Sequence, residues 1–210
     1  LIRSVRMSNL CITNYCNISK GKIYANDKLI FESNVTDFES FTGELYKKLE
    51  LNYPKFHKMD NLTKLGWLAS ELVIKNVHIN CNPYKFAINI MNCDSSIDTD
   101  ICYQNIIDNN KSSPSIFVYT LPNIMIGEIC IKNNIKGDNL LQISEIFDIP
   151  SQYNYMHSLF EAGIVEKSIC GWVNFNKNKY EAFLYIIEKI KAADSLPFNI
   201  ETINKLFKKN

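Results

Sequence analysis

Cysteine and histidine are the residues of this chain that could act as nucleophiles, proton carriers or metal ligands. The 210 residues include seven cysteines, at positions 11, 16, 81, 93, 102, 130 and 170, and three histidines. No C-x-x-C pair or Cys/His cluster is present, so the spacing predicts neither a zinc site nor a cofactor. We expect reduced thiols that contribute mainly to the core. His57, His78 and His157 stand alone in the sequence and are expected to be structural.

Residues 113–139 are the part of the chain that the other elements should surround. They comprise SPSIFVYTLPN, an apolar run and a Gly137-Asp138-Asn139 turn. We expect residues 115–122 to be extended, with Pro122 in the first turn of a helix that is buried on more than one side. The segment offers no acid, base or nucleophile, which indicates a packed wall instead of a reaction centre.

The flanking sequence predicts alternating strands and helices. Caps are expected at Asp37, Asp60 and Asn199, and a hairpin turn at Asn26-Asp27. Residues 180–188 fit a strand or a helix, because length and periodicity do not separate the two. The expected strands are 10–15, 23–31 (a hairpin), 84–91, 140–147 and 167–175, and the expected helices are 37–48, 60–76, 99–107, 151–163 and 199–209. This order predicts one α/β domain over residues 1–210, with helices on the faces of a mixed sheet.

Composition limits the classes of partner. The chain is 46% hydrophobic and carries 23 basic and 22 acidic residues, for a net charge of +1. So even a balance gives no electrostatic case for binding nucleic acid or an anionic membrane. No apolar run approaches the roughly 18 residues of a membrane span. The first residues lack the apolar core of a signal peptide, so we expect a cytoplasmic protein.

Three separated motifs carry a resemblance to a known family. They are KMDNLTKLGWLA (residues 58–69), SPSIFVYTLPN with its Gly-Asp-Asn turn, and CGWV (residues 170–173). Their order and spacing resemble the N-terminal half of β-ketoacyl synthases (ketosynthases), which have the thiolase-like fold. The resemblance covers most of residues 55–174, and residues 1–50 and about 180–210 diverge. It implies a βαβαβαββ half with a mixed sheet.

The resemblance also implies a nucleophilic cysteine at the start of the helix that follows the Gly-Asp-Asn turn. Ungapped counting places Ile146 at that position, and no cysteine lies between Cys130 and Cys170. An isoleucine cannot accept an acyl group from a thioester, and no base is identifiable beside Ser144 or Ser151. The histidines of the family's second half have no counterparts among the three here. We therefore expect no catalytic residue.

Three functions remain open from the sequence. The favoured one is a noncatalytic accessory or partner subunit in fatty acid or polyketide-type biosynthesis. The alternatives are a component of an active 3-oxoacyl carrier-protein synthase that another subunit completes, and an unrelated α/β binding module. The resemblance implies a homodimer or a heterodimer with a ketosynthase, and an acyl carrier protein as a further partner. We also expect self-association because a half-fold leaves apolar surface unpaired. The candidate dimer-seam and acyl-tunnel residues are Phe117, Tyr119, Thr120, Leu121, Pro122, Asn123, Ser144 and Ile146.

Overall fold

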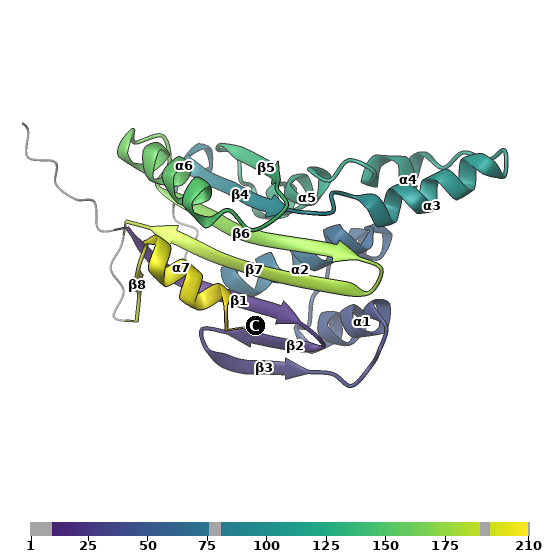
Figure 1. The fold of residues 1–210 in the computed structure, drawn as a ribbon, viewed down its shortest axis with the longest axis horizontal. Helices are drawn as coiled ribbons and strands as arrows, with labels where there is room; N and C mark the ends of the chain where they lie inside the picture. Colours follow the sequence, from purple (N-terminus) through teal and green to yellow (C-terminus); the bar gives the residue numbers. More distant parts are fainter. Residues whose placement is uncertain (1–9, 76–80, 190–193, 210) are drawn as a thin grey trace, which may run out of the picture.

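One mixed β-sheet forms the centre of the computed structural model, which describes residues 10–75, 81–189 and 194–209 (Figure 1). Within these residues the strand order is β3-β2-β1-β7-β6-β4-β5, and β8 pairs with β1. Strands β4, β5 and β6 are mutually parallel, whereas β7 is antiparallel to both β6 and β1. The strands are β1 (Cys11–Ser19), β2 (Lys22–Ala25), β3 (Lys28–Glu32), β4 (Phe86–Asn92), β5 (Asn139–Ile143), β6 (Lys167–Asn176), β7 (Lys179–Glu188) and β8 (Leu196–Pro197).

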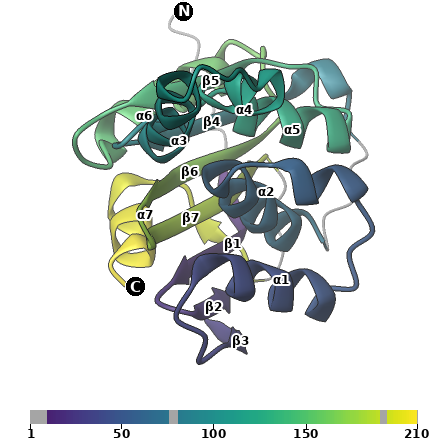
Figure 2. The same cartoon turned by 90° about the vertical axis from the view of Figure 1, so that its right-hand side faces the viewer.

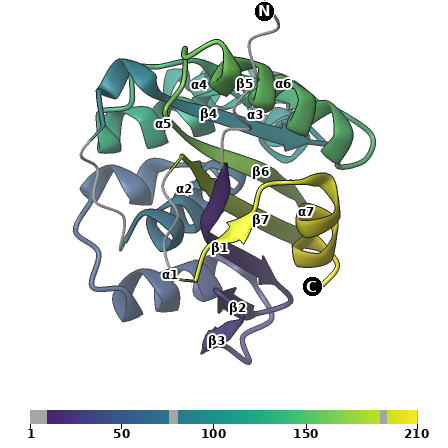
Figure 3. The same ribbon diagram turned by 90° about the vertical axis from the view of Figure 1, so that its left-hand side faces the viewer.

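Helices cover both faces of the sheet (Figure 3). Helices α1, α2 and α5 pack on one face, and α6 and α7 on the other. Helices α3 and α4 lie beside each other and project from one end of the molecule (Figures 1 and 2). The helices are α1 (Phe38–Lys48), α2 (Asn61–Ile74), α3 (Ile97–Asp108), α4 (Pro114–Tyr119), α5 (Ile124–Asn133), α6 (Ile149–Glu161) and α7 (Ile200–Phe207), with short 3-10 turns η1 (Pro54–Lys58) and η2 (Pro83–Lys85).

The succession β1-α2-β4-α5-β5-α6-β6-β7 is the βαβαβαββ order that the resemblance implies, so the expected α/β half-fold is confirmed. The hairpin β2–β3, helices α1, α3, α4 and α7, and strand β8 are additions to it. Every residue of β4 is buried, as is typical of a parallel strand with helices on both faces.

Several local predictions are confirmed by hydrogen bonds. The Asp37, Asp60 and Asn199 side chains accept from the backbone N–H groups three residues later, at 2.8, 3.0 and 2.7 Å. Asn26 and Asp27 adopt the left-handed conformation of a hairpin turn, with φ of 47° and 65°. Residues 180–188 belong to strand β7, which pairs along its length with both β1 and β6.

Several predicted boundaries were wrong: the strand expected over 10–15 runs to Ser19, and the strand expected from Tyr84 begins at Phe86. Residues 115–122 are not extended, since Pro114 occupies the first turn of α4, where proline is tolerated. Pro122 lies in the turn before α5 and not within that helix. The strand expected over 140–147 ends at Ile143 and is followed by a loop over residues 144–148. Helix α6 begins at Ile149, two residues before the expected start at Ser151. The Asp148 side chain caps α6 by accepting from the Ser151 N–H at 3.0 Å.

Helix α7 covers the part of the sheet that α6 leaves open. Ile203 and Leu206 are 0% and 2% exposed and belong to the apolar cluster between the sheet, α6 and α7. The Asn17 side chain donates to the Leu206 carbonyl at 3.1 Å, and Lys209 pairs with Asp27 at 2.7 Å. This face is therefore covered from within the chain. No helix of the described residues is long and apolar enough to cross a membrane.

Candidate functional site

The loop between β5 and α6, residues 144–148, holds the position predicted for the nucleophile. Ile146 is 69% exposed there. The Ser144 N–H donates to the Asn92 carbonyl at 2.8 Å, which fixes the start of the loop to the end of β4. Among the described residues, neither the Ser144 nor the Ser151 hydroxyl hydrogen-bonds to a base. The loop therefore presents an aliphatic side chain and no activated hydroxyl. The equivalence of Ile146 to the family's cysteine stays a prediction.

The cysteines of the described residues form no disulfide and do not cluster with other metal ligands. Cys16 and Cys170 are fully buried, and burial raises the pKa of each thiol to about 12. Burial raises the pKa of Cys130 to about 11. A thiol with so high a pKa carries almost no thiolate at neutral pH, so these three are not nucleophiles. Cys102, on α3, is exposed.

The histidines have aromatic neighbours. His57 lies against the rings of Tyr46 and Phe56, at 5.2 and 5.7 Å between centroids. His157 lies 5.6 Å from the ring of Tyr153. His78 falls outside the described residues.

The predicted seam and tunnel residues of the α4 region differ in exposure. Phe117 and Leu121 are 52% and 51% exposed, and Asn123 is exposed as well. Thr120 and Pro122 are half-buried. Tyr119 alone among the six is buried, at 7% exposed. Their role at a dimer seam or an acyl tunnel stays a prediction.

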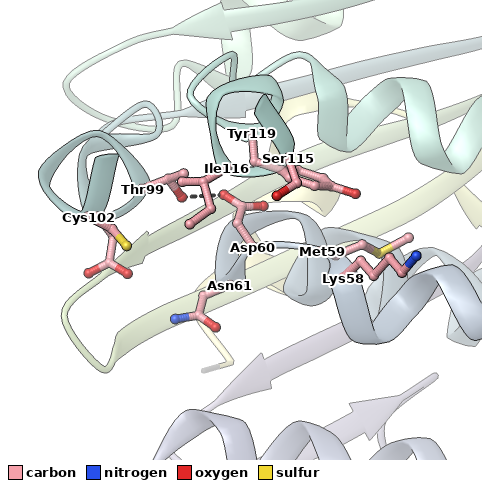
Figure 4. A pocket seen from close by; sticks show the side chains of 10 residues that line it. Lys58, Met59, Asp60, Asn61, Thr99, Cys102, Ser115, Ile116 and Tyr119 are labelled. Carbon is pink, nitrogen blue, oxygen red and sulfur yellow. Dashed lines mark hydrogen bonds between the residues drawn. The ribbon is translucent and has the colours of Figure 1, made fainter. Parts of the chain in front are cut away.

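A pocket of about 550 Å³ lies between the start of α2, α3 and α4 (Figure 4). Its lining combines carboxylates, an ammonium group, hydroxyls, an amide, a thiol and apolar groups from these three segments. The lining residues are Lys58, Met59, Asp60, Asn61, Asp98, Thr99, Cys102, Ser115, Ile116 and Tyr119.

Asp60 is the group around which this pocket is assembled. Its Oδ1 accepts from the Thr63 N–H at 3.0 Å, which caps α2, and its Oδ2 accepts from the Thr99 hydroxyl at 2.7 Å. The second bond ties α3 to α2 (Figure 4). Burial raises the pKa of Asp60, the two threonine donors lower it, and the Asp98 carboxylate raises it further.

Tyr119 is the buried aromatic residue that α4 contributes to the pocket. Burial raises the pKa of its phenol to about 12, and the Glu128 and Asp60 carboxylates add to that rise. Glu128 is itself buried and pairs with Lys55 at 2.6 Å. The phenol therefore stays protonated at neutral pH and can hydrogen-bond but cannot act as a base.

The sequence did not reveal this pocket. Asp60 was predicted as a helix cap, and its neighbours Lys58 and Met59 only as matches to the family motif. The lining residues on α3 and α4 lie 38 to 59 residues after Asp60 in the sequence. The sequence feature that could have indicated this pocket was the capping aspartate, because its second carboxylate oxygen remains available to another partner.

Comparisons with known proteins identify the fold. No protein-family model matches the sequence, and no curated protein does. Solved structures do match: a chain of the ishigamide ketosynthase/chain length factor is 15% identical with a TM-score of 0.67, over 90% of this chain and 64% of that one. A chain of the ketosynthase ApeO in complex with its chain length factor ApeC, from Xenorhabdus doucetiae, is 11% identical with a TM-score of 0.60, over 96% and 92%.

A third match is the AntDE:AntF complex of a type II polyketide acyl carrier protein with its ketosynthase, at 13% identity and a TM-score of 0.57, over 85% of this chain and 62% of that one. The chain thus has the ketosynthase fold and spans 62–64% of two of these matched chains and nearly all of the other. The shared fold counts against an unrelated α/β module.

Proposed function

We propose that this chain is a noncatalytic subunit of fatty acid or polyketide-type assembly that acts by pairing with a ketosynthase or with a second copy of itself. One observation carries the proposal. The chain keeps the ketosynthase half-fold but exposes Ile146 where the resemblance places the nucleophilic cysteine. An isoleucine in that position cannot carry an acyl intermediate, so we infer that the chain contributes through binding.

The matched structures support the class of partner. Two of them are ketosynthase and chain length factor pairs, and one holds a ketosynthase with its acyl carrier protein. The ApeO–ApeC match covers 96% of this chain and 92% of the matched chain.

The two open edges of the sheet differ in how well they resist pairing. The β3 edge begins with Lys28, ends with Glu32 and has a register shift against β2 that leaves Ile30 as an extra residue. Edge charges and bulges discourage the addition of another strand. The β5 edge, NLLQI, has no charge, no proline and no register shift against β4. We propose β5 as the partner-binding edge.

The backbone of β5 leaves alternate residues free for a partner. The Asp138 carbonyl accepts from Ile88 N–H, and Ser144 N–H donates to the Asn92 carbonyl, so even-numbered residues face β4. Alternation then turns the N–H and C=O groups of Asn139, Leu141 and Ile143 toward the open edge. Ile143 is 55% exposed and adds apolar surface to that of Ile146 in the adjoining loop.

Sedimentation of the chain alone and mixed with a type II polyketide ketosynthase tests this pairing. We expect a dimer or a heterodimer, and Ile143→Pro should weaken it at least about tenfold, because proline removes one outward N–H and blocks strand addition. Ile143→Thr is the matched control, since it keeps the N–H and a β-branched side chain. The proposal would be refuted if the chain stayed monomeric at high concentration and did not bind the ketosynthase.

Intact-mass spectrometry after incubation with an acyl carrier thioester tests the absence of catalysis. We expect no stoichiometric acyl adduct on the chain. An adduct on Ser144 or Ser151 would instead support the alternative of an enzyme that a second subunit completes, as would condensation activity that appears only when this chain is added to its partner.

A further inference from the structure

The pocket between α2, α3 and α4 shares no lining residue with the 144–148 loop or with β5. Its volume of about 550 Å³ lies within the range of small-molecule sites. Three separate segments build it, and the Thr99–Asp60 hydrogen bond holds two of them in place. It is therefore a formed cavity whose chemistry can be considered apart from the pairing surface.

The carboxylates of Asp60 and Asp98 line the same pocket as the Lys58 side chain but form no ion pair with it. Asp60 accepts hydrogen bonds only from neutral donors, the Thr63 N–H and the Thr99 hydroxyl. In the described parts of the chain, neither Asp60 nor Asp98 forms an ion pair. The Thr99 hydroxyl hydrogen is already used by Asp60, so that side chain offers the cavity an acceptor. A partly buried carboxylate without a cation is unfavourable and attracts positive charge.

The two nearby lysines do not neutralise the carboxylates of Asp60 and Asp98. Lys55 pairs with the buried Glu128 at 2.6 Å. Figure 4 shows the Lys58 side chain pointing away from Asp60, toward the side of Met59. Among the described residues neither lysine pairs with Asp60 or Asp98, so both carboxylates are available to a cation from solution.

Apolar groups stand beside the carboxylates. Met59 is 4% exposed and Tyr119 is 7% exposed, and Ile116 lines the same pocket from α4. An unbranched thioether and an aromatic ring accommodate a short alkyl chain and can lie against a cation. A bare metal ion would gain nothing from this side of the cavity, whereas an organic cation would gain from both sides.

We propose that this pocket binds a small organic cation, an alkylammonium or alkylguanidinium, with its charged group on Asp60 and Asp98 and its alkyl chain against Met59, Ile116 and Tyr119. The inference does not depend on the proposed pairing function. It assigns a second, separate binding site to the chain.

Titration calorimetry with agmatine and butylamine, and with butan-1-ol as the neutral counterpart, tests this site. We expect saturable binding of both cations and none of the alcohol. Asp60→Asn should weaken cation binding at least about tenfold, since it removes the charge but keeps an acceptor able to cap α2. Lys58→Gln should leave the affinity equal or slightly higher.

Alkylation of Cys102 gives an independent readout, because this exposed thiol lines the same pocket. Agmatine should slow its labelling in the native chain and leave the rate unchanged in Asp60→Asn. If Asp60→Asn no longer unfolds cooperatively, Asp98→Asn replaces it as the test variant. Failure of both cations to bind, equal binding of butan-1-ol, or unchanged affinity in a folded carboxylate variant would overturn the site. None of these outcomes bears on dimer formation.

Discussion

Replacement of Ile203 by alanine examines how the second face of the sheet is covered. Helix α7 has eight residues, too few to be stable alone, so it must be held by contacts with the sheet. Ile203 is 0% exposed, within a cluster that includes Phe183 and Tyr185 of β7. Truncation of a fully buried isoleucine costs about 2–5 kcal/mol, through lost burial and the cavity left behind. Such a cost is a large part of the roughly 5–15 kcal/mol that stabilises a domain.

Urea unfolding followed by circular dichroism measures this cost. Ile164→Ala is the matched control, because Ile164 is 52% exposed and its truncation should cost less than about 0.5 kcal/mol. We expect the midpoint to fall for Ile203→Ala with an unchanged m-value. If both variants lost the same small amount of unfolding free energy, α7 would not cover the sheet, and another subunit would be needed to cover it.

Two further predictions concern backbone space and thiol reactivity. Gly171 has φ of 146°, and a Cβ there would overlap the Phe183 carbonyl, so Gly171→Ala should cost about 2–4 kcal/mol of unfolding free energy. Gly127, in α5, has open space around it, and Gly127→Ala should gain up to about 1 kcal/mol in the same urea titration. In native protein at pH 8, a maleimide should label Cys102, whereas Cys16 and Cys170, whose pKa burial raises to about 12, should react only after unfolding. Equal costs for the two glycines, or labelling of the buried thiols in folded chain, would contradict these accounts.

Local chemistry made much of the fold predictable. The caps at Asp37, Asp60 and Asn199 and the turn at Asn26-Asp27 depend on residues within three positions of one another, so their outcome is independent of the rest of the chain. The prediction that residues 115–122 are extended was wrong, because SIFVYTLP is apolar without a clear helix or strand period. Pro114, at the start of this segment, favoured a helix instead.

The sequence by itself determined the helix caps, the hairpin turn and the aliphatic residue at position 146, since these follow from local patterns, whereas the βαβαβαββ order was implied by the family resemblance. Only the tertiary structure decided that residues 179–188 form a strand, that α7 covers one face, and that Asp60 meets Thr99 from α3. Each of these depends on segments tens of residues apart meeting in space. Such contacts arise from packing of the whole sheet and its helices, which no local pattern encodes.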